Sequence, residues 1–341
     1  MILLSIIIPA YNVKDYIVDC LHSCYRLQGA NGLCADEWEI IVVDDGSTDE
    51  TPALLQAEAE VHRNLRIIRQ HNQGQSVARN LAIEQAQGQY IYMVDSDDRL
   101  IPDCSLPIKD IREGRFDIIG LQVYYQPEQG PMRPWSHQME RWPFDQEYAT
   151  AADFLRTHNI EGLVYGYVFR RALFLEHPEL RFTPGIYHQD EELIFKIFTL
   201  AGRTVYRRGY TYLYYEHAGS SINTRTEARK RKLMDDYLTI LRNLVAWRER
   251  YGTSDPRSAE LRQVMHYKLS YLSMDILRFL IRNRHEYDYI LHIVDELKHL
   301  GLYPLPNIPE VKYMAMKALT CRPSLIAWWA SHAKLNKKIG F

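Results

Sequence analysis

Two aspartates at the end of an apolar run carry the clearest chemical signal in this sequence. Asp95 and Asp97 flank Ser96 directly after the stretch 88–94, which has the composition of a buried strand. Two carboxylates at the carboxyl end of a strand could hold a hard divalent cation, Mn²⁺ or Mg²⁺, against a bound diphosphate. The same tripeptide also arises by chance in polar loops, so the rest of the chain must decide between these interpretations.

The segments before Asp95 follow the order of a parallel α/β sheet. Residues 3–12, 38–51 and 64–88 each begin with apolar, largely β-branched residues and continue into a polar loop. The second and third loops lead into helical patterns. Strands that alternate with helices predict an α/β fold with a mostly parallel sheet flanked by helices, and with ligands at the carboxyl ends of the strands.

Composition limits the class of protein. A chain of 341 residues is expected to form one large domain and a smaller one. A formal net charge of −2 gives no indication of nucleic-acid binding. The five cysteines form no C-x-x-C pair, which favours a reducing, cytoplasmic compartment over a disulfide framework or a zinc site. Cys20 and Cys24, one helical turn apart, are expected in the core.

No segment of the sequence predicts a leader peptide or a membrane span. The apolar start at 1–8 lacks a basic region and a cleavage site, so we expect it to be the first strand. No stretch approaches the roughly 18 uninterrupted apolar residues of a spanning helix.

A helical region is predicted from about residue 226 to the end at 341. Apolar residues there recur at three- and four-residue spacings, the pattern of amphipathic helices. From Val311 onward the chain has six Lys or Arg, no Asp or Glu, and the pair Trp328 and Trp329. Two interpretations remain open for this end: peripheral contact with an anionic membrane, on its cytoplasmic face, or a helix docked on its own domain.

The motifs of the first two thirds of the chain, taken in order, resemble a known enzyme family. They are SIIIPAYN at 5–12, VVDDGSTDET at 42–51, GQSVARNLAI at 74–83, YIYMVDSDD at 90–98, FTPGIYHQDEELIFKIF at 182–198 and YYEHAGSSI at 214–222. This order and spacing are similar to the inverting family 2 of nucleotide-sugar glycosyltransferases, which have the GT-A fold and include bacterial cell-surface polysaccharide glycosyltransferases. The resemblance implies a catalytic domain at 1–225, with a nucleotide-sugar-binding half at 1–100 and an acceptor-binding half at 101–225.

The resemblance implies roles for the residues on the donor side. Asp97 would bind the metal directly, and Asp95 would bind the donor ribose or the metal through water. Asp45 would recognise the base, with uridine favoured because a carboxylate accepts an imide N–H, and Asp44 would support that loop. Either aspartate could instead cap the following helix. The loop that would enclose the nucleoside contains Pro9, Tyr11 and Asn12.

Arg79 and Asn80 follow the Gly74 loop. They are expected to contact the donor phosphates or sugar, or to brace the Asp95 loop, and Arg79 could equally form a salt bridge with a nearby aspartate.

On the acceptor side, inversion by single displacement requires a base opposite the leaving group. The resemblance assigns this role to Asp190. Gln189 departs from the family pattern, which usually has Glu there, and Glu191 is a rival base. The acids could also simply favour the start of a helix.

Two further groups of residues have open roles. His217 could complete the metal site or contact the diphosphate, in a loop where Ser220 or Ser221 would donate hydrogen bonds. Trp135, Trp142 and Phe144 could stack on acceptor sugars or fix a long loop to the domain.

The leading prediction is a metal-dependent inverting glycosyltransferase that moves a sugar from a nucleoside-diphosphate donor, UDP favoured, to a hydroxyl of a glycan or lipid-linked acceptor in surface polysaccharide biosynthesis. A nucleotidyltransferase is an alternative, although no Gly-rich basic loop follows the first strand. A non-catalytic nucleotide-binding scaffold is the other alternative, suggested by Gln189. An oxidoreductase is disfavoured because no G-x-G-x-x-G follows the first strand.

Overall fold

The computed structural model divides the chain into two compact units, Met1–Thr224 and Arg225–Phe341. The structure describes residues 1–30, 32–102, 106–136, 142–160, 162–217, 226–251, 258–283, 286–303 and 324. The basic end from Val311, apart from residue 324, lies outside these residues, as do the loop residues Ser220 and Ser221, and Cys104 and Cys321.

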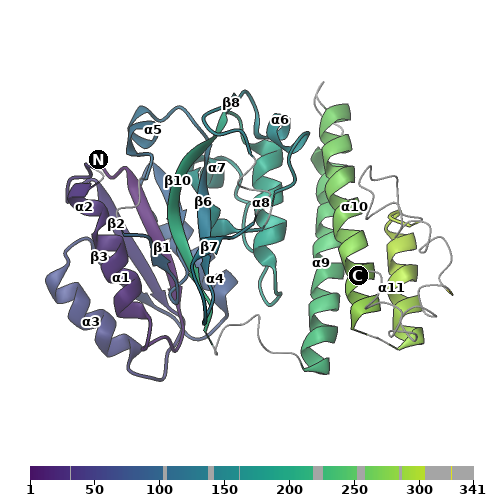
Figure 1. The fold of residues 1–341 in the computed structure, drawn as a ribbon, viewed down its shortest axis with the longest axis horizontal. Helices are drawn as coiled ribbons and strands as arrows, with labels where there is room; N and C mark the ends of the chain where they lie inside the picture. Colours follow the sequence, from purple (N-terminus) through teal and green to yellow (C-terminus); the bar gives the residue numbers. More distant parts are fainter. Residues whose placement is uncertain are drawn as a thin grey trace. The chain divides into compact units, whose positions relative to one another are not determined.

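The first unit is an α/β domain (Figure 1). Its strands are β1 (Leu4–Ala10), β2 (Trp38–Asp44), β3 (Leu65–Arg69), β4 (Tyr90–Met93), β5 (Arg99–Leu100), β6 (Ile118–Gln126), β7 (Arg133–Pro134), β8 (Glu147–Tyr148), β9 (Tyr167–Arg170) and β10 (Thr204–Tyr215). Its helices are α1 (Ile17–Tyr25), α2 (Leu27–Ala30), α3 (Thr51–Val61), α4 (Gln75–Gln85), α5 (Ile108–Glu113), α6 (Ala151–Leu155), the 3-10 turn η2 (Val164–Gly166), α7 (Arg171–Glu176) and α8 (Gln189–Leu200).

One sheet joins all of these strands. Its order is β3-β2-β1-β4-β9-β6-β10-β5, with β7 paired to β6 and β8 to β10. The pairs among β1 to β4 are parallel, and β9 runs antiparallel to both β4 and β6. β6 therefore runs in the same direction as β4, so the carboxyl ends of β1, β2, β4, β6 and β10 lie at one edge of the sheet.

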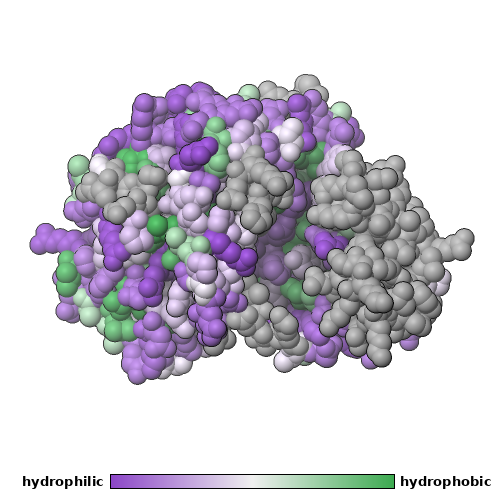
Figure 2. Space-filling model, viewed as in Figure 1, coloured by the Kyte–Doolittle hydropathy of each residue, from purple (hydrophilic) through white to green (hydrophobic). Residues whose placement is uncertain are grey.

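The core lies along the central strands. Every residue of β1 and β2 is buried, as expected for strands covered on both faces. Cys20 and Cys24 of α1 are fully buried, which confirms their expected place in the core. Figure 1 shows α1 and α3 on one side of the sheet and α8 on the other. On the face in Figure 2, the described surface of this unit is mostly hydrophilic, with small, separate hydrophobic patches.

The second unit consists, within its described residues, of the helices α9 (Glu227–Tyr251), α10 (Ser258–Arg282) and α11 (Tyr287–His299). Buried apolar side chains such as Leu241, Leu277 and Ile293 form its core, which agrees with the amphipathic patterns of the sequence. Among the described residues of the whole chain, none of the helices has the length and apolar content needed to cross a membrane.

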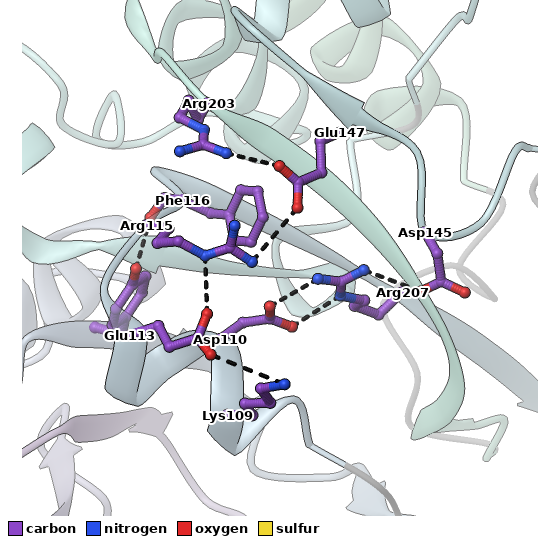
Figure 3. A network of polar contacts seen from close by, with 10 residues as sticks. Lys109, Asp110, Glu113, Arg115, Phe116, Asp145, Glu147, Arg203 and Arg207 are labelled. Carbon is purple, nitrogen blue, oxygen red and sulfur yellow. Dashed lines mark hydrogen bonds and ion pairs between the residues drawn. The ribbon is translucent and has the colours of Figure 1, made fainter.

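A dense network of ion pairs surrounds Phe116, at the amino ends of β6 and β10 (Figure 3). The guanidinium groups of Arg115, Arg203 and Arg207 lie 5.0, 5.5 and 5.6 Å from the centre of its ring. Asp110 accepts two hydrogen bonds from Arg207, at 2.7 and 2.8 Å, and Glu147 pairs with Arg203 at 2.6 Å. This Phe116 network lies at the sheet edge opposite to the carboxyl ends of the strands.

Candidate active site

Three aspartates follow β4 at the carboxyl edge of the sheet. Asp95 forms an ion pair with Arg79 of α4. Asp97 Oδ2 lies 3.0 Å from His217 Nε2, which comes from the segment just after β10. Asp98 is 2% exposed and accepts hydrogen bonds from the Tyr212 hydroxyl at 2.5 Å and the Tyr215 backbone N–H at 2.8 Å. The structure thus places Asp97 beside His217 and gives Asp95 a different partner.

Burial and mutual repulsion act on these carboxyl groups. Burial raises the pKa of Asp97, the charge of Asp95 raises it further, and the hydrogen bond from His217 opposes the shift. Burial raises the pKa of Asp98 well above its usual value, with additional repulsion from Asp97 and Asp95. The ionised forms of Asp97 and Asp98 are therefore disfavoured, and a cation bound nearby would stabilise them.

The residues present suit a metal ion only if other ligands complete its coordination. Within the described part of the chain there is no group of three or more His, Cys, Asp or Glu side chains that could hold a metal. Asp97 and His217 supply two candidate ligands at 3.0 Å from each other. Mn²⁺ and Mg²⁺ often keep water and bind substrate phosphates besides one or two carboxylates, so this pair fits a cation that is shared with a diphosphate.

Asp190 lies in the first turn of α8, on the acceptor side predicted from the sequence. Burial raises its pKa to about 6, while the charges of His188 and Arg79 lower it. His188 precedes the helix with φ 54°, a left-handed conformation that non-glycine residues adopt at a cost. Glu191, the rival base, packs beside Gly162, where a Cβ would lie 2.5 Å from Glu191 Oε2. These features favour Asp190 as the base candidate.

Helix α4 connects the donor-side aspartates to the segment that carries Asp190. Arg79 is 2% exposed, and its guanidinium lies 5.1 Å from the centre of the Phe182 ring. Asn80 donates to the Phe182 carbonyl and accepts from the Phe182 N–H, both at 2.9 Å. Gln189 Nε2 donates to Gln75 Oε1 at 3.0 Å. Arg79 thus forms the salt bridge with a nearby aspartate that was one of its expected contacts, and Asn80 binds the segment around Phe182.

Asp44 and Asp45 both serve the loops around the carboxyl end of β2. Asp44 accepts a hydrogen bond from the Ser47 N–H at 2.9 Å and pairs with Arg69 at 3.2 Å. Asp45 is 3% exposed and accepts from the Gln70 side chain at 2.7 Å and from the Gly74 N–H at 2.8 Å. Asp44 therefore closes the turn before α3, and Asp45 fixes the loop that leads to α4.

The loop after β1 lies against the loop after β2. Asn12 has φ 50°, and its side-chain oxygen accepts the Thr48 N–H at 2.8 Å. Pro9 is buried within β1, whereas Tyr11 is 46% exposed. A nearby open cavity of about 530 Å³ is large enough for a nucleoside. Its lining residues are Gly46, Ser47, Thr48, Arg69, Gln70, His71 and Asn72.

The three aromatic residues of the long loop have different environments. Trp142 is 3% exposed and packs on Phe154 and Tyr206, with ring centroids 5.1 and 4.8 Å away. Phe144 also lies against Tyr206, at 5.5 Å. These two fix the loop to the domain. Trp135, by contrast, is only partly buried.

The match to a family model places the chain among known proteins. The model described as glycosyl transferase family 2 matches residues 5–176, about half of the chain. The chain belongs to glycosyl transferase family 2.

Named relatives of this family 2 chain are bacterial. "Glycosyltransferase GlyA" of Streptococcus pneumoniae is 27% identical over 252 residues, which are 71% of this chain and 35% of that protein. The uncharacterized glycosyltransferase YibD of Escherichia coli is 27% identical over 278 residues, 78% of this chain and 76% of YibD. The chain thus spans about a third of GlyA and about three quarters of YibD.

A solved structure shares the fold. Residues 1–349 of S. aureus TarS, in complex with UDP-GlcNAc, match with a TM-score of 0.65 at 19% identity, over 98% of this chain and 92% of that one. The GT-A fold predicted from the sequence is confirmed.

Several residues of the site escaped the sequence analysis of this family 2 chain. Gln70, His71 and Asn72 line the cavity at the end of β3, and Asp98 and Tyr212 lie beneath Asp95. A general signal was present for the first group, because polar residues that follow a parallel strand are expected at the ligand-binding edge. Tyr212 gave no such signal within an aromatic-rich strand.

Proposed function

We propose that the protein is a metal-dependent inverting glycosyltransferase that uses a nucleoside-diphosphate sugar, UDP favoured, and a hydroxyl acceptor on a glycan or lipid-linked molecule. The position of Arg79 carries this proposal. It pairs with Asp95 at the donor edge, and its charge also acts on Asp190 at the start of α8. The charge of one buried guanidinium therefore acts on both a candidate donor-binding group and the candidate base.

The cavity beside β2 and β3 supports the nucleoside part of the donor site. It adjoins the loops that Asp44, Asp45 and Asn12 hold together. A carboxylate can accept about four hydrogen bonds, so Asp45 could still receive an imide N–H of uracil. UDP is favoured because TarS, which shares the fold, has been solved with UDP and with UDP-GlcNAc.

Asp97 and His217 are the residues proposed to hold Mn²⁺ or Mg²⁺, with Asp95 nearby through water or on the donor ribose. When bound, such a cation neutralises negative charge that develops on the departing diphosphate. Arg79 of α4 pairs with Asp95 in the loop after β4, and Ser96 in that loop is buried.

Asp190 is proposed to accept the proton of the acceptor hydroxyl. As the hydroxyl oxygen bonds to the anomeric carbon, the bond from that carbon to the diphosphate oxygen breaks, and the nucleoside diphosphate leaves with the bonding electron pair. Attack from the face opposite to the leaving group inverts the anomeric configuration. A raised pKa makes Asp190 a stronger base than an exposed aspartate while leaving it mostly ionised at neutral pH.

The "Putative teichuronic acid biosynthesis glycosyltransferase TuaG" of Bacillus subtilis is 41% identical over 98 residues, 28% of this chain and 36% of TuaG. This likeness supports a place in surface polysaccharide biosynthesis, which would locate the reaction at the cytoplasmic face of a membrane. The basic end with Trp328 and Trp329 remains a predicted membrane contact. Sedimentation with anionic liposomes that declines at high salt, and that is lost on truncation after Pro309, would support it.

Thermal unfolding with UDP, GDP, dTDP or CMP, each with Mn²⁺ or with chelator, tests the donor site directly. A ligand at about a hundred times its dissociation constant adds roughly 2.7 kcal/mol to the free energy of unfolding. We expect a metal-dependent rise in midpoint with UDP that Asp97→Ala abolishes. If no sugar nucleotide is turned over, the non-catalytic scaffold alternative replaces this proposal, and the midpoint shifts show whether that scaffold still binds a nucleotide.

A further inference from the structure

Three aromatic side chains form a cluster where β6, β7 and β10 end; we call Tyr125, Trp135 and Tyr214 the aromatic platform. Tyr125 and Tyr214 are register partners in the parallel pair β6–β10, so they project from the same face of the sheet. Trp135 donates its backbone N–H to the Val123 carbonyl at 2.9 Å, which places it beside them. The Trp135 ring centroid lies 5.0 Å from that of Tyr214 and 5.9 Å from that of Tyr125.

The platform is more open than the aromatic stack behind it. Tyr165 and Tyr212 stack at 4.2 Å with an interplanar angle of 7°, and they are 5% and 0% exposed. All three platform side chains are partly exposed. Trp135 meets Tyr214 at an interplanar angle of 74° and Tyr125 at 77°, so these contacts are near-perpendicular, unlike the parallel stack of Tyr165 and Tyr212.

The platform is continuous with the candidate active site. Its neighbour Tyr212 donates to Asp98, and the same hydroxyl accepts the Asp95 N–H at 3.1 Å. Beyond Tyr214, the chain reaches His217, which pairs with Asp97. The Tyr165 ring connects the two, because it stacks on Tyr212 and lies 6.5 Å from Trp135. A molecule bound on the platform would therefore extend from the reacting groups.

Charged groups adjoin the platform. The Tyr125 hydroxyl donates to the Glu216 carboxylate, and the Arg133 guanidinium lies 5.0 Å from the centre of the Tyr125 ring. A pyranose ring presents a face of C–H groups, which aromatic faces attract, and a rim of hydroxyls, which carboxylates and guanidinium groups bind. Aromatic surfaces with a few polar groups are typical of sites for such amphipathic ligands.

We propose that the aromatic platform is an acceptor subsite that stacks a pyranose ring, so that the acceptor is a glycan chain with a sugar ring next to the reacting hydroxyl. This inference rests on the proposed glycosyl transfer and specifies its acceptor class. It separates Trp135, which faces this subsite, from the buried Trp142, which only fixes the loop.

Binding of defined saccharides to the full-length protein, saturated with UDP and Mn²⁺, tests the subsite. The probes are linear trisaccharides of glucose, galactose, N-acetylglucosamine and N-acetylgalactosamine, with ribitol phosphate and glycerol phosphate as open-chain controls, measured by saturation-transfer NMR and titration. We expect at least one trisaccharide to bind and the open-chain compounds not to bind. Trp135→Ala should weaken that binding about tenfold, and Trp135→Phe, which keeps a flat ring, should retain most of it.

Trp142→Phe is the matched control, because it removes a buried tryptophan on the same loop. Its saccharide affinity should equal that of the wild type, and Tyr214→Leu should reproduce the loss seen with Trp135→Ala. A UDP-dependent rise in the unfolding midpoint shows that each variant is folded. The proposal is overturned if no trisaccharide binds the wild type, if Trp135→Ala binds as well as the wild type, or if the open-chain compounds bind equally well.

The two proposals fail in different ways. If UDP stabilises the protein and sugar nucleotide is consumed, but no trisaccharide binds, only the pyranose subsite is wrong. If neither UDP nor any sugar nucleotide binds, the proposed function is wrong, and saccharide binding that responds to Trp135→Ala would then describe a lectin-like surface.

Discussion

The carboxylates beyond β4 and those of the Phe116 network lie at opposite edges of one sheet, and their partners differ. In the network, Asp110 is held by two hydrogen bonds from Arg207, and Glu147 lies between Arg203 and Arg115. At the site, Asp98 is held by a tyrosine hydroxyl and a backbone N–H, next to Asp97.

The difference distinguishes a cluster of acids that is compensated by arginines from one that is not. Arginine partners compensate the acids around Phe116 locally, so that edge needs no further ligand. At the other edge, burial and neighbouring acids raise the pKa of Asp97 and Asp98. Acids with raised pKa values and incomplete charge compensation are typical of functional sites, where a bound cation can neutralise them or where they accept a proton during a reaction.

Asp190→Asn, at the carboxyl edge of the sheet, should have the largest effect on activity of the substitutions considered for the two edges. Removal of the proposed base should lower kcat about 10²- to 10⁴-fold, and UDP binding measured by thermal shift should persist. Glu191→Gln is the matched control and should keep most of the activity. The opposite result, an active Asp190→Asn and an inactive Glu191→Gln, would move the base to Glu191.

Asp190→Asn should also change the free energy of unfolding, in a direction that depends on pH. The pKa of Asp190 is raised from 3.8 to about 6 in the folded state, so its contribution to stability is fully present below 3.8 and is lost as the pH rises through 6. Asp190→Asn should therefore be more stable than the wild type at pH 7.5, by roughly 1–3 kcal/mol, with no difference near pH 4. Urea denaturation at both pH values measures this difference, and an equal stability at pH 7.5 would contradict the raised pKa.

Arg79→Met should remove the positive charge that pairs with Asp95. Loss of the ion pair leaves Asp95 partly buried without its cation, which should cost about 3 kcal/mol of folding free energy. Activity should fall in parallel, since the same side chain acts on Asp190. A loss below 1 kcal/mol in urea denaturation would show that Asp95 is solvated well enough to need no partner.

Gln189→Glu adds a carboxylate to the first turn of α8 and replaces the amide that donates to Gln75. A like charge next to Asp190 should raise its pKa further. For the wild type, kcat/KM should decline below about pH 6, about tenfold per pH unit. In the variant this midpoint should lie at higher pH, whereas Gln75→Glu, which places a carboxylate on α4 rather than on the residue next to Asp190, should move it less. An unchanged pH profile would show that a charge at position 189 does not affect the pKa of Asp190.

Arg203→Met tests the Phe116 network and should have the smallest effect. The Arg203 side chain is 49% exposed, and exposed ion pairs contribute about 0–1 kcal/mol. Folding stability should change by less than about 1 kcal/mol, and kcat/KM should not change. A large loss of activity would show that the two edges are coupled through β10.

The sequence predicts the edge where the site lies because strand composition and polar ends are local features. Asp44, Asp95 and Asp97 come directly at or after strands whose apolar residues are contiguous, so their placement follows from the order of strands. The role of Asp190 rests on its resemblance to a family motif, and in the structure the charge of Arg79, which pairs with Asp95, lowers the pKa of Asp190.

Partner choice could not be predicted, because it depends on contacts between distant segments. Asn80 binds the backbone of Phe182, 102 residues later, and nothing in either local sequence indicates this pair. Likewise, Trp135 and Trp142 lie seven positions apart in one loop without periodicity, and only the three-dimensional structure shows that one is buried and the other partly exposed.

The contacts of α4 bear on how this protein could be engineered. Gln75 and Asn80 hold Gln189 and Phe182, which come after residue 176, where the family model ends. A chimera that joins the first half of this chain to the second half of a relative would cut through these contacts. For the proposed acceptor subsite, replacing surface side chains on β6, β7 and β10 is therefore a more direct route to new acceptor specificity than exchanging whole halves, because such replacements leave the α4 contacts intact.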